Sequence, residues 1–216
     1  MKFSKTIATL ALIAAAVPAV AAQTTIDFEG TASFGSILEF YNGGVDAAGN
    51  SGANYGVSLT ASATSLSNDN LNNYFSNAPT PGTVMFAPDS MAYLNAANGF
   101  FNSVSLYYSS DIAAPNSVNI YSGLNGTGDL LGSFSLNMNA QTGCTDTSFC
   151  NFELSTVTFS GTGKSISFDG AAGHTAFDNV AFDNVAVTPV PEPTTYALMM
   201  LGLAGIGMVA RRRRSV

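Results

Sequence analysis

Hydrophobic and polar residues alternate through most of the middle of the chain. Val104, Leu106 and Tyr108 occupy every second position of NSVSLYYS, and the same period recurs in NSVNIYSG, STVTFSG and KSISFDG. A period of two places alternate side chains on opposite faces of a strand. Glycine, asparagine and proline separate these short runs, which is typical of an all-β sandwich. We therefore expect residues 23–189 to form one antiparallel β-sandwich domain, with successive hairpins between residues 110 and 170.

Two segments depart from the simple alternation. AFDNV occurs twice in tandem, at 176–180 and 181–185, and an odd repeat would turn Phe177 and Phe182 to opposite faces of an uninterrupted strand. Either both faces are covered there, or a bulge or an Asx turn restores the phase; we expect the bulge. The stretch 61–81 is rich in Asn and Ser and predicts a long loop, pinned by Tyr74 and Phe75, that is mobile or lines a site.

The N-terminal segment has the pattern of a secretory signal peptide. Lys2 and Lys5 precede an apolar run, and small residues end at Ala22 before Gln23. This order of a basic region, a short apolar region and a small-residue cleavage site predicts a signal peptide at 1–22, cut between Ala22 and Gln23. We expect export by the Sec machinery.

The C-terminal segment predicts a transmembrane helix at 194–210, followed by an arginine cluster at 211–214. Counted from Pro193, the helix is roughly 27 Å long at 1.5 Å per residue, close to the hydrocarbon thickness of about 30 Å. Arginines at its end favour the cytoplasmic side. The preceding domain is then expected across the membrane, where the signal peptide also directs it.

These last residues resemble the PEP-CTERM sorting signal, which joins a Pro-Glu-Pro motif, here 191–193, to a short transmembrane helix and an arginine cluster. The resemblance covers 190–214 of the predicted sorting segment 190–216 and implies a substrate of an exosortase, a membrane-embedded, cysteine transpeptidase-like enzyme of Gram-negative bacteria. It further implies transient anchoring in the inner membrane facing the periplasm, cleavage near the motif, and a final location at the cell surface or outside the cell. A permanent anchor is the alternative. The residues that carry the resemblance are Val190, Pro191, Glu192, Pro193, Arg211, Arg212, Arg213 and Arg214.

The charge of the chain is distributed unevenly between the domain and its ends. Thirteen of the fourteen acidic residues lie within 23–189, whereas Lys164 is the only Lys or Arg there. A domain this acidic repels nucleic acid and anionic lipid surfaces, so we exclude a nucleic-acid partner. Divalent cations, neutral glycans and basic partners stay compatible with it.

Cys144 and Cys150 are the only cysteines of the chain. In an oxidising compartment, two cysteines this close predict a small disulfide loop. A metal site is the alternative, although the spacing and the lack of a nearby histidine do not match a zinc motif.

The segments IDFEG and FDNVAV resemble the first and last strands of jelly-roll domains related to carbohydrate-binding modules. This resemblance makes the expected fold jelly-roll-like and implies a structural calcium ion between the two strands. Calcium takes six to eight oxygen ligands. The candidate ligands are Asp27, Glu29, Asp178 and Asp183, and solvated acids at strand ends are the alternative.

Candidate chemistry beyond sorting is sparse. His174 is the only histidine, and no G-x-S-x-G, HExxH or glycine-rich phosphate loop occurs. A glycosidase built from two carboxylates is a remaining alternative. Tyr107 and Tyr121 are candidates for an aromatic glycan platform on neighbouring strands, with Tyr108 in the core, although the chain has no tryptophan.

We therefore predict an exported, exosortase-processed protein of the cell surface or extracellular matrix, associated with exopolysaccharide or biofilm and without catalysis. A carbohydrate-binding β-sandwich module is the alternative function.

Overall fold

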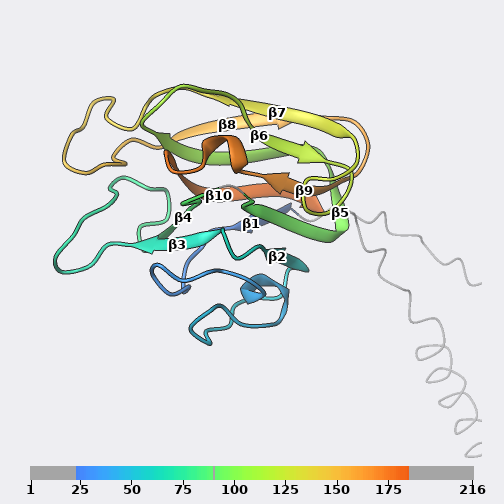
Figure 1. The fold of residues 1–216 in the computed structure, drawn as a ribbon, viewed down its shortest axis with the longest axis horizontal. Coiled ribbons are helices and arrows are strands. Elements are labelled where there is room, and N and C mark those ends of the chain that lie inside the picture. The colour runs from blue at the N-terminus through green and yellow to red at the C-terminus, as the bar shows by residue number, and fades with distance from the viewer. Residues whose placement is uncertain (1–22, 90, 185–216) are drawn as a thin grey trace, which may run out of the picture. The chain divides into compact units, whose positions relative to one another are not determined.

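The computed structural model describes residues 23–89 and 91–184, which form an antiparallel all-β domain (Figure 1). The prediction of an all-β antiparallel domain is confirmed, and the finer jelly-roll assignment stays a prediction. Two short 3-10 turns, η1 (Phe40–Asn42) and η2 (Asp169–Ala171), interrupt the strands. The strands are β1 (Gln23–Ile26), β2 (Val57–Leu59), β3 (Thr64–Ser67), β4 (Thr83–Phe86), β5 (Tyr93–Ser110), β6 (Ala114–Tyr121), β7 (Leu130–Leu136), β8 (Glu153–Thr158), β9 (Gly163–Ser167) and β10 (Thr175–Asn184).

The long strand β5 divides the ten-stranded sheet into two layers. Its first residues pair with β2 and β9, and β9 continues to β6 and β7. Its later residues pair with β8 on one side and β10 on the other. Strand β10 also pairs with β1 and with β4. Strand β4 in turn pairs with β3. Gly99, with φ of 80°, lies between the two parts, where a residue without Cβ accepts this backbone conformation freely.

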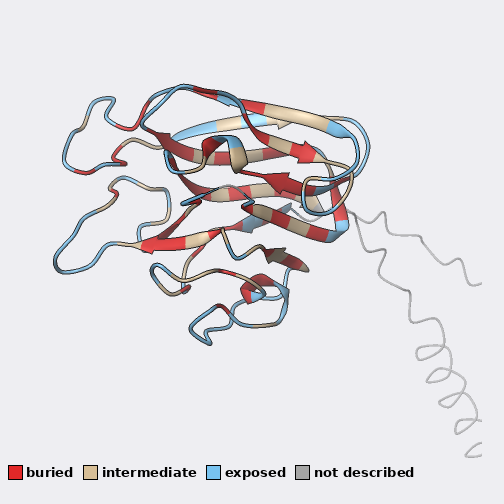
Figure 2. Ribbon diagram, viewed as in Figure 1, coloured by how far each residue is buried: buried red, intermediate tan, exposed pale blue. Residues whose placement is uncertain are grey.

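The main core lies between these two layers. Leu106 and Phe177 of one layer and Ile120 and Ile166 of the other are fully buried members of a single hydrophobic cluster. Figure 2 shows buried residues in bands along the strands and exposed residues along the loops. Burial of apolar surface is the dominant favourable contribution to folding, and every residue of this core lies between Ile26 and Phe182. The described domain therefore has a continuous core of its own.

A bulge in β10 keeps the tandem AFDNV repeat in phase with the core. The register of β10 against β5 shifts between Asp178 and Ala181, and Asn179 has a positive φ of 47°. The extra residue restores the alternation, so Phe177 and Phe182 both belong to the main core. The predicted bulge is confirmed.

A second, smaller hydrophobic cluster covers the outer face of the layer that contains β4 and β10. Val84 and Ala176 from these strands contact Phe75 and Phe149 from two long loops, 68–82 and 137–152. This layer is thus buried on both faces where the two loops cross it. The predicted loop is shorter than expected, since β3 occupies part of 61–81, and Phe75 pins it as predicted.

The expectation of successive hairpins between residues 110 and 170 is wrong in its pairing. Only β6 and β7 form a hairpin among the described strands of this region, because β8 and β9 pair with β5 instead. Turn residues mark where a strand ends, whereas partner choice depends on which faces must be buried together.

The two ends of the described domain lie side by side. Gln23 of β1 pairs with Asp183 of β10, so the first and last strands of the described domain are neighbours. The predicted signal peptide at 1–22 and the predicted sorting segment at 190–216 lie outside the described residues. Within the described ranges, no helix has the length and apolar character needed to cross a bilayer.

Candidate functional site

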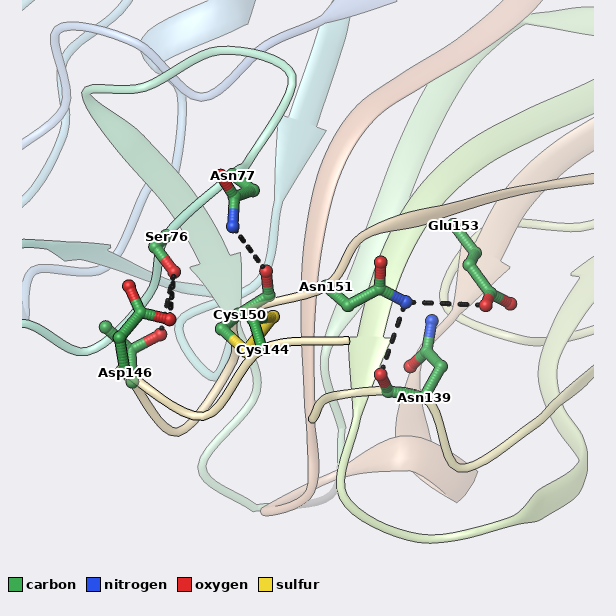
Figure 3. The surroundings of a disulfide bond; sticks show 9 residues. Ser76, Asn77, Asn139, Cys144, Asp146, Cys150, Asn151 and Glu153 are labelled. Atoms are coloured by element: carbon green, nitrogen blue, oxygen red, sulfur yellow. Dashed lines mark hydrogen bonds between the residues drawn. A yellow bond between two sulfur atoms is a disulfide. The ribbon is translucent and has the colours of Figure 1, made fainter. Parts of the chain in front are cut away.

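A disulfide bond closes the loop that follows β7. Cys144 and Cys150 are bonded, with their Cα atoms 6.0 Å apart, so the predicted disulfide is confirmed. Figure 3 shows this bond beside the loop 68–82, with Ser76 and Asn77 facing it. The disulfide therefore lies where two loops that are far apart in sequence meet.

Backbone hydrogen bonds join the two loops directly. Phe75 and Phe149 form a parallel bridge, in which the amide of Ser76 donates to the Phe149 carbonyl at 3.0 Å. The Asn77 side-chain amide donates to the Cys150 carbonyl at 2.9 Å. The two phenylalanine side chains are buried in the outer cluster, so hydrogen bonds and apolar packing hold the same junction.

The loop 68–82 is ordered by its own polar side chains. The Asn68 side chain accepts hydrogen bonds from the amides of Tyr74 and Phe75 and donates to the Phe75 carbonyl. Asp69 accepts from the amides of Leu71 and Asn72, and these bonds lower the pKa of Asp69. Asn and Asp form such local bonds readily and so replace regular structure in loops. The loop lines a hollow of the surface, and its predicted role at a site stays a prediction.

A groove of about 290 Å³ runs between the two loops; we call it the loop groove. Ser76 Oγ donates to Asp146 Oδ1 at 3.1 Å and lies 3.2 Å from Thr147 Oγ1. The second carboxylate oxygen, Asp146 Oδ2, has no hydrogen-bond partner within the described part of the chain. The polar lining residues are Asn68, Asn73, Ser76, Asn77, Asp146 and Thr147.

Cys144, Asp146 and Cys150 are the only described His, Cys, Asp or Glu residues that bring three ligand atoms within 4.8 Å of one another. The two sulfur atoms are bonded to each other, whereas a metal ligand must be a free thiolate. The arrangement therefore acts as a covalent staple that fixes the position of Asp146.

Three of the four predicted calcium ligands surround the segment 79–83. Asp178 Oδ1 and Oδ2 accept hydrogen bonds from the Thr80 hydroxyl, and Oδ2 also accepts from the Thr80 amide at 2.8 Å. Glu29 Oε1 accepts from the amides of Gly82 and Thr83. Asp27 Oδ1 accepts from the Tyr41 hydroxyl at 3.2 Å. The carboxylates of Asp178 and Glu29 thus hold the segment against the domain, whereas Asp27 contacts it through its backbone carbonyl, which accepts from the Thr80 hydroxyl at 3.3 Å.

Asp183 lies apart from the other three carboxylates. It pairs with Gln23 at the end of β10, and its Oδ2 lies 3.5 Å from the Asn102 side-chain amide. No three of the four predicted ligands bring their oxygen atoms within 4.8 Å of one another in the described structure. The calcium site stays a prediction.

Asp178 is the most strongly perturbed acid of this group. Its side chain is fully buried, and burial raises its pKa to about 6, although the hydrogen bonds from Thr80 and Asn179 oppose the rise. The charge of Glu29 raises it further. Burial and the neighbouring Asp27 likewise raise the pKa of Tyr41.

Tyr107 and Tyr121, the predicted aromatic platform, are not brought together. Tyr107 lies on the outer face of the β8–β5–β10 layer, opposite Leu154 and Asp178. Tyr121 lies on the outer face of the other layer, opposite Ser165. The layers face each other through their buried residues, so these two tyrosines point to opposite sides of the domain. Tyr108 is buried in the core, as predicted.

Tyr121 instead has an aromatic neighbour that the sequence did not single out. Tyr93 of β5 shares the outer face of this layer, and its pKa is raised by the hydrogen bond to Asp169, by burial and by the electrostatic influence of Asp169 and Tyr121. The sequence contained a signal for this position: Tyr93 directly precedes the buried Leu94, so the alternation of β5 places Tyr93 on the outer face.

His174 lies in the loop before β10 and contacts one acid. Its Nδ1 is 2.9 Å from Asp111 Oδ1, and both side chains are about half exposed. The nearby Ser110 Oγ bonds to the carbonyl oxygens of Ile112 and His174 and to Thr175. Ser110 therefore has no bond to the imidazole, and the described structure assembles no serine–histidine pair here.

Asp111 also borders a second hollow of about 310 Å³, which Met138 and Gln141 line. This hollow lies beside the His174–Asp111 pair. Met138 and Gln141 were not singled out from the sequence.

Several solved structures are similar to the domain at low level. The carbohydrate-binding module CsCBM6-3 from Clostridium stercorarium, solved with cellobiose, has 16% identity and a TM-score of 0.36, covering 60% of this chain and 93% of its own. A β-1,3-glucan-binding family 6 module from Bacillus halodurans has 13% identity and a TM-score of 0.39, with 59% and 89% coverage. The K2 cleaved adhesin domain of Lys-gingipain has 17% identity and a TM-score of 0.43, with 74% and 99% coverage.

Structural similarities this low assign no function. No curated protein matches the chain. The C-terminal segment does match a family: residues 189–214 correspond to the PEP-CTERM protein-sorting motif. The predicted resemblance is confirmed, and this chain is a protein that carries a PEP-CTERM sorting motif.

Proposed function

We propose that this protein is an exported component of the cell surface or extracellular matrix, released or transferred by an exosortase and without catalytic activity. The observation that carries the proposal is the sorting motif at 189–214, which supports export with transient anchoring at the C-terminus. The motif begins five residues after the last described strand residue, Asn184. Processing there leaves the domain whole.

The architecture of the domain suits cleavage at both ends. The proposed signal-peptide cut after Ala22 precedes β1, and the proposed sorting cut near Pro191 follows β10. The two apolar clusters of the described part of the chain lie between these points. We therefore expect the domain to stay folded after both targeting segments are removed.

The absence of catalysis is part of the proposal. Its support is the surroundings of His174, whose ring is hydrogen-bonded only to Asp111 among the described residues, together with the lack of a nucleophile or phosphate-loop motif in the sequence. Hydrolysis of a glycan panel by the purified domain, abolished by one carboxylate substitution, would overturn this part.

The intact mass of the mature protein from its native host tests the main proposal. We expect a chain that starts at Gln23 and ends near Pro191, and a Glu192→Ala variant that accumulates in the inner membrane with Val216 still present. A Glu153→Ala variant, changed at an exposed acid of the domain, is the matched control and should be processed normally. Recovery of the unchanged protein as a stable membrane species that retains Val216 would refute it.

Carbohydrate binding is the second candidate function. The specific observation is the outer face on which Tyr93 and Tyr121 flank β9, opposite Ser167 and Ser165. Asn119 and Ser133 of this layer are half-buried and hydrogen-bonded to each other. Aromatic rings with neighbouring polar groups combine apolar contact with oriented hydrogen bonding. Retention of the domain on immobilised polysaccharide should weaken in a Tyr121→Ala variant and persist in Tyr55→Ala, an exposed tyrosine elsewhere. A Tyr107→Ala variant tests the other predicted platform residue separately.

A further inference from the structure

We propose that the loop groove binds an amino-sugar unit of a polysaccharide, with Asp146 accepting hydrogen bonds from the protonated amine. This extends the carbohydrate candidate described above to a different place on the domain and to a specific chemistry. The groove is formed by the loops 68–82 and 137–152 and does not include Tyr93 or Tyr121.

The groove offers free acceptors at fixed positions. Asp146 Oδ2 has no partner within the described residues, and Asn77 uses its amide nitrogen on the Cys150 carbonyl, which leaves its Oδ1 without one. Ser76 Oγ and Thr147 Oγ1 lie 3.2 Å apart beside the carboxylate. A carboxylate oxygen can only accept hydrogen bonds, so Asp146 Oδ2 favours a ligand that donates them, and a primary ammonium offers three donors.

Charge favours a cationic ligand over a neutral one. Asp146 has no basic neighbour in the groove, because neither loop contains Lys, Arg or His. Hydrogen bonds with an ionised partner are stronger than neutral ones. The surrounding domain, with Lys164 as its only Lys or Arg, adds a long-range attraction for a cation.

The shape and the apolar part of the lining favour a sugar over a bare amine. Ala78 and Pro81 complete the groove beside the polar residues, and a pyranose ring presents apolar C–H groups together with its hydroxyls. The volume of about 290 Å³ lies near the lower end of the usual range for small-ligand sites, roughly 300 Å³ and above. One sugar unit of a longer chain matches this size.

The rigidity of the groove comes from the disulfide and the bridge between the loops. Cys144 and Cys150 flank Asp146 and hold it beside Ser76, as Figure 3 shows. Phe75 and Phe149 anchor both loops in the outer cluster. A binding site whose groups are already positioned loses less conformational entropy when the ligand binds.

The groove also lies away from the chain ends. Asn139 of the second loop is hydrogen-bonded to Ser110, which pairs with Thr175 at the start of β10, whereas Gln23 pairs with Asp183 near its end. Eight residues of strand separate these points, roughly 26 Å at 3.3 Å per residue. Figure 1 shows both loops at one side of the domain, and β1 begins toward the other. The second loop thus meets β10 at the end opposite the one that pairs with Gln23.

Calorimetric titration of the domain with a glucosamine oligomer and with its N-acetylated counterpart tests the inference. We expect the amino form to bind and the acetylated form to bind at least about tenfold more weakly, since acetylation removes the charge from the hydrogen bond. Asp146→Asn should weaken binding of the amino form by a similar factor while still accepting the Ser76 hydrogen bond. Asp129→Asn, which removes an exposed acid outside the groove, is the matched control and should bind normally.

Two further variants keep the test informative. Asn73→Asp adds a second carboxylate at the groove and should strengthen binding of the amino form. The Cys144→Ser/Cys150→Ser pair should weaken it while far-ultraviolet circular dichroism shows an intact sheet.

The outcomes distinguish this inference from the proposed functions. Equal binding of both oligomers, unchanged by Asp146→Asn, would leave carbohydrate affinity standing and overturn the groove assignment. Equal competition by a lysine oligomer would overturn the sugar specificity. Binding of neither oligomer nor of any polysaccharide would refute the carbohydrate candidate together with this inference, while the mass measurement tests export independently.

Discussion

The buried carboxylate of Asp178 gives the clearest test of the energetics of this fold. Its side chain is fully buried against the segment 79–83, and burial raises its pKa from 3.8 to about 6. The native state therefore binds more protons than the unfolded chain between about pH 4 and pH 6, so this group lowers the free energy of unfolding as the pH rises through that window. The effect is complete above the native pKa.

An Asp178→Asn substitution should remove this dependence. Asparagine keeps an oxygen that can accept from the Thr80 amide, and it cannot ionise. The difference between 3.8 and about 6 corresponds to about 3 kcal/mol at about 1.4 kcal/mol per pH unit. Relative to the natural domain, the variant should therefore gain about 3 kcal/mol of stability between pH 4 and pH 7.

Urea unfolding at several pH values measures this difference. Circular dichroism is a suitable probe because the chain has no tryptophan, and the isolated domain is appropriate because the described residues form a core of their own. Asp129→Asn, at an exposed acid, provides the control and should follow the natural domain. A difference between Asp178→Asn and the natural domain that stays constant from pH 4 to pH 7 would refute the reasoning.

Three other substitutions probe packing and the disulfide, each measured by denaturant unfolding. Phe177→Ala should cost about 3–5 kcal/mol because it empties a fully buried position between the layers; a loss below about 1 kcal/mol would contradict that burial. Replacing Cys144 and Cys150 by serine should cost about 2 kcal/mol through the freedom regained by the short loop, and an unchanged midpoint would argue against it. Gly170→Ala should cost about 1–3 kcal/mol, since a Cβ there would lie 2.6 Å from the Ser117 Cα; a neutral effect would show that this turn can move.

The strands were predictable where one face is buried and the other is not. The alternation of Val104, Leu106 and Tyr108 records the inward face of β5 directly, and all three are buried as expected. The repeated AFDNV was informative for the same reason, because two phenylalanines out of phase require a local correction, and Asn179 provides it.

The partners of the strands were not predictable. Alternation is a property of one strand and says nothing about its neighbour, so β8 and β9 were expected to form hairpins although they pair with β5. The same limit affected the tyrosines. Tyr107 and Tyr121 each lie on an outer face, but the sequence could not show that these faces belong to different layers.

The candidate groove was only partly visible in the sequence. The disulfide followed from the spacing of Cys144 and Cys150, and a site along the loop at 61–81 was anticipated from its composition. The contact of Ser76 with Asp146 spans seventy residues. Local patterns carry no information about such a contact, which exists because Phe75 and Phe149 share one apolar cluster.

The transport signal could be identified from the order of residues alone, because a sorting motif is a linear arrangement of residue types and matches at 189–214 without reference to any fold. The order of residues also determined the all-β class, through a period of two that each strand displays alone. Only the tertiary structure decided which strands pair, that Asp178 is buried beneath the segment 79–83, and that two distant loops enclose a groove. These features depend on the packing of apolar surfaces from segments that are far apart in the sequence, and such long-range burial leaves no local pattern.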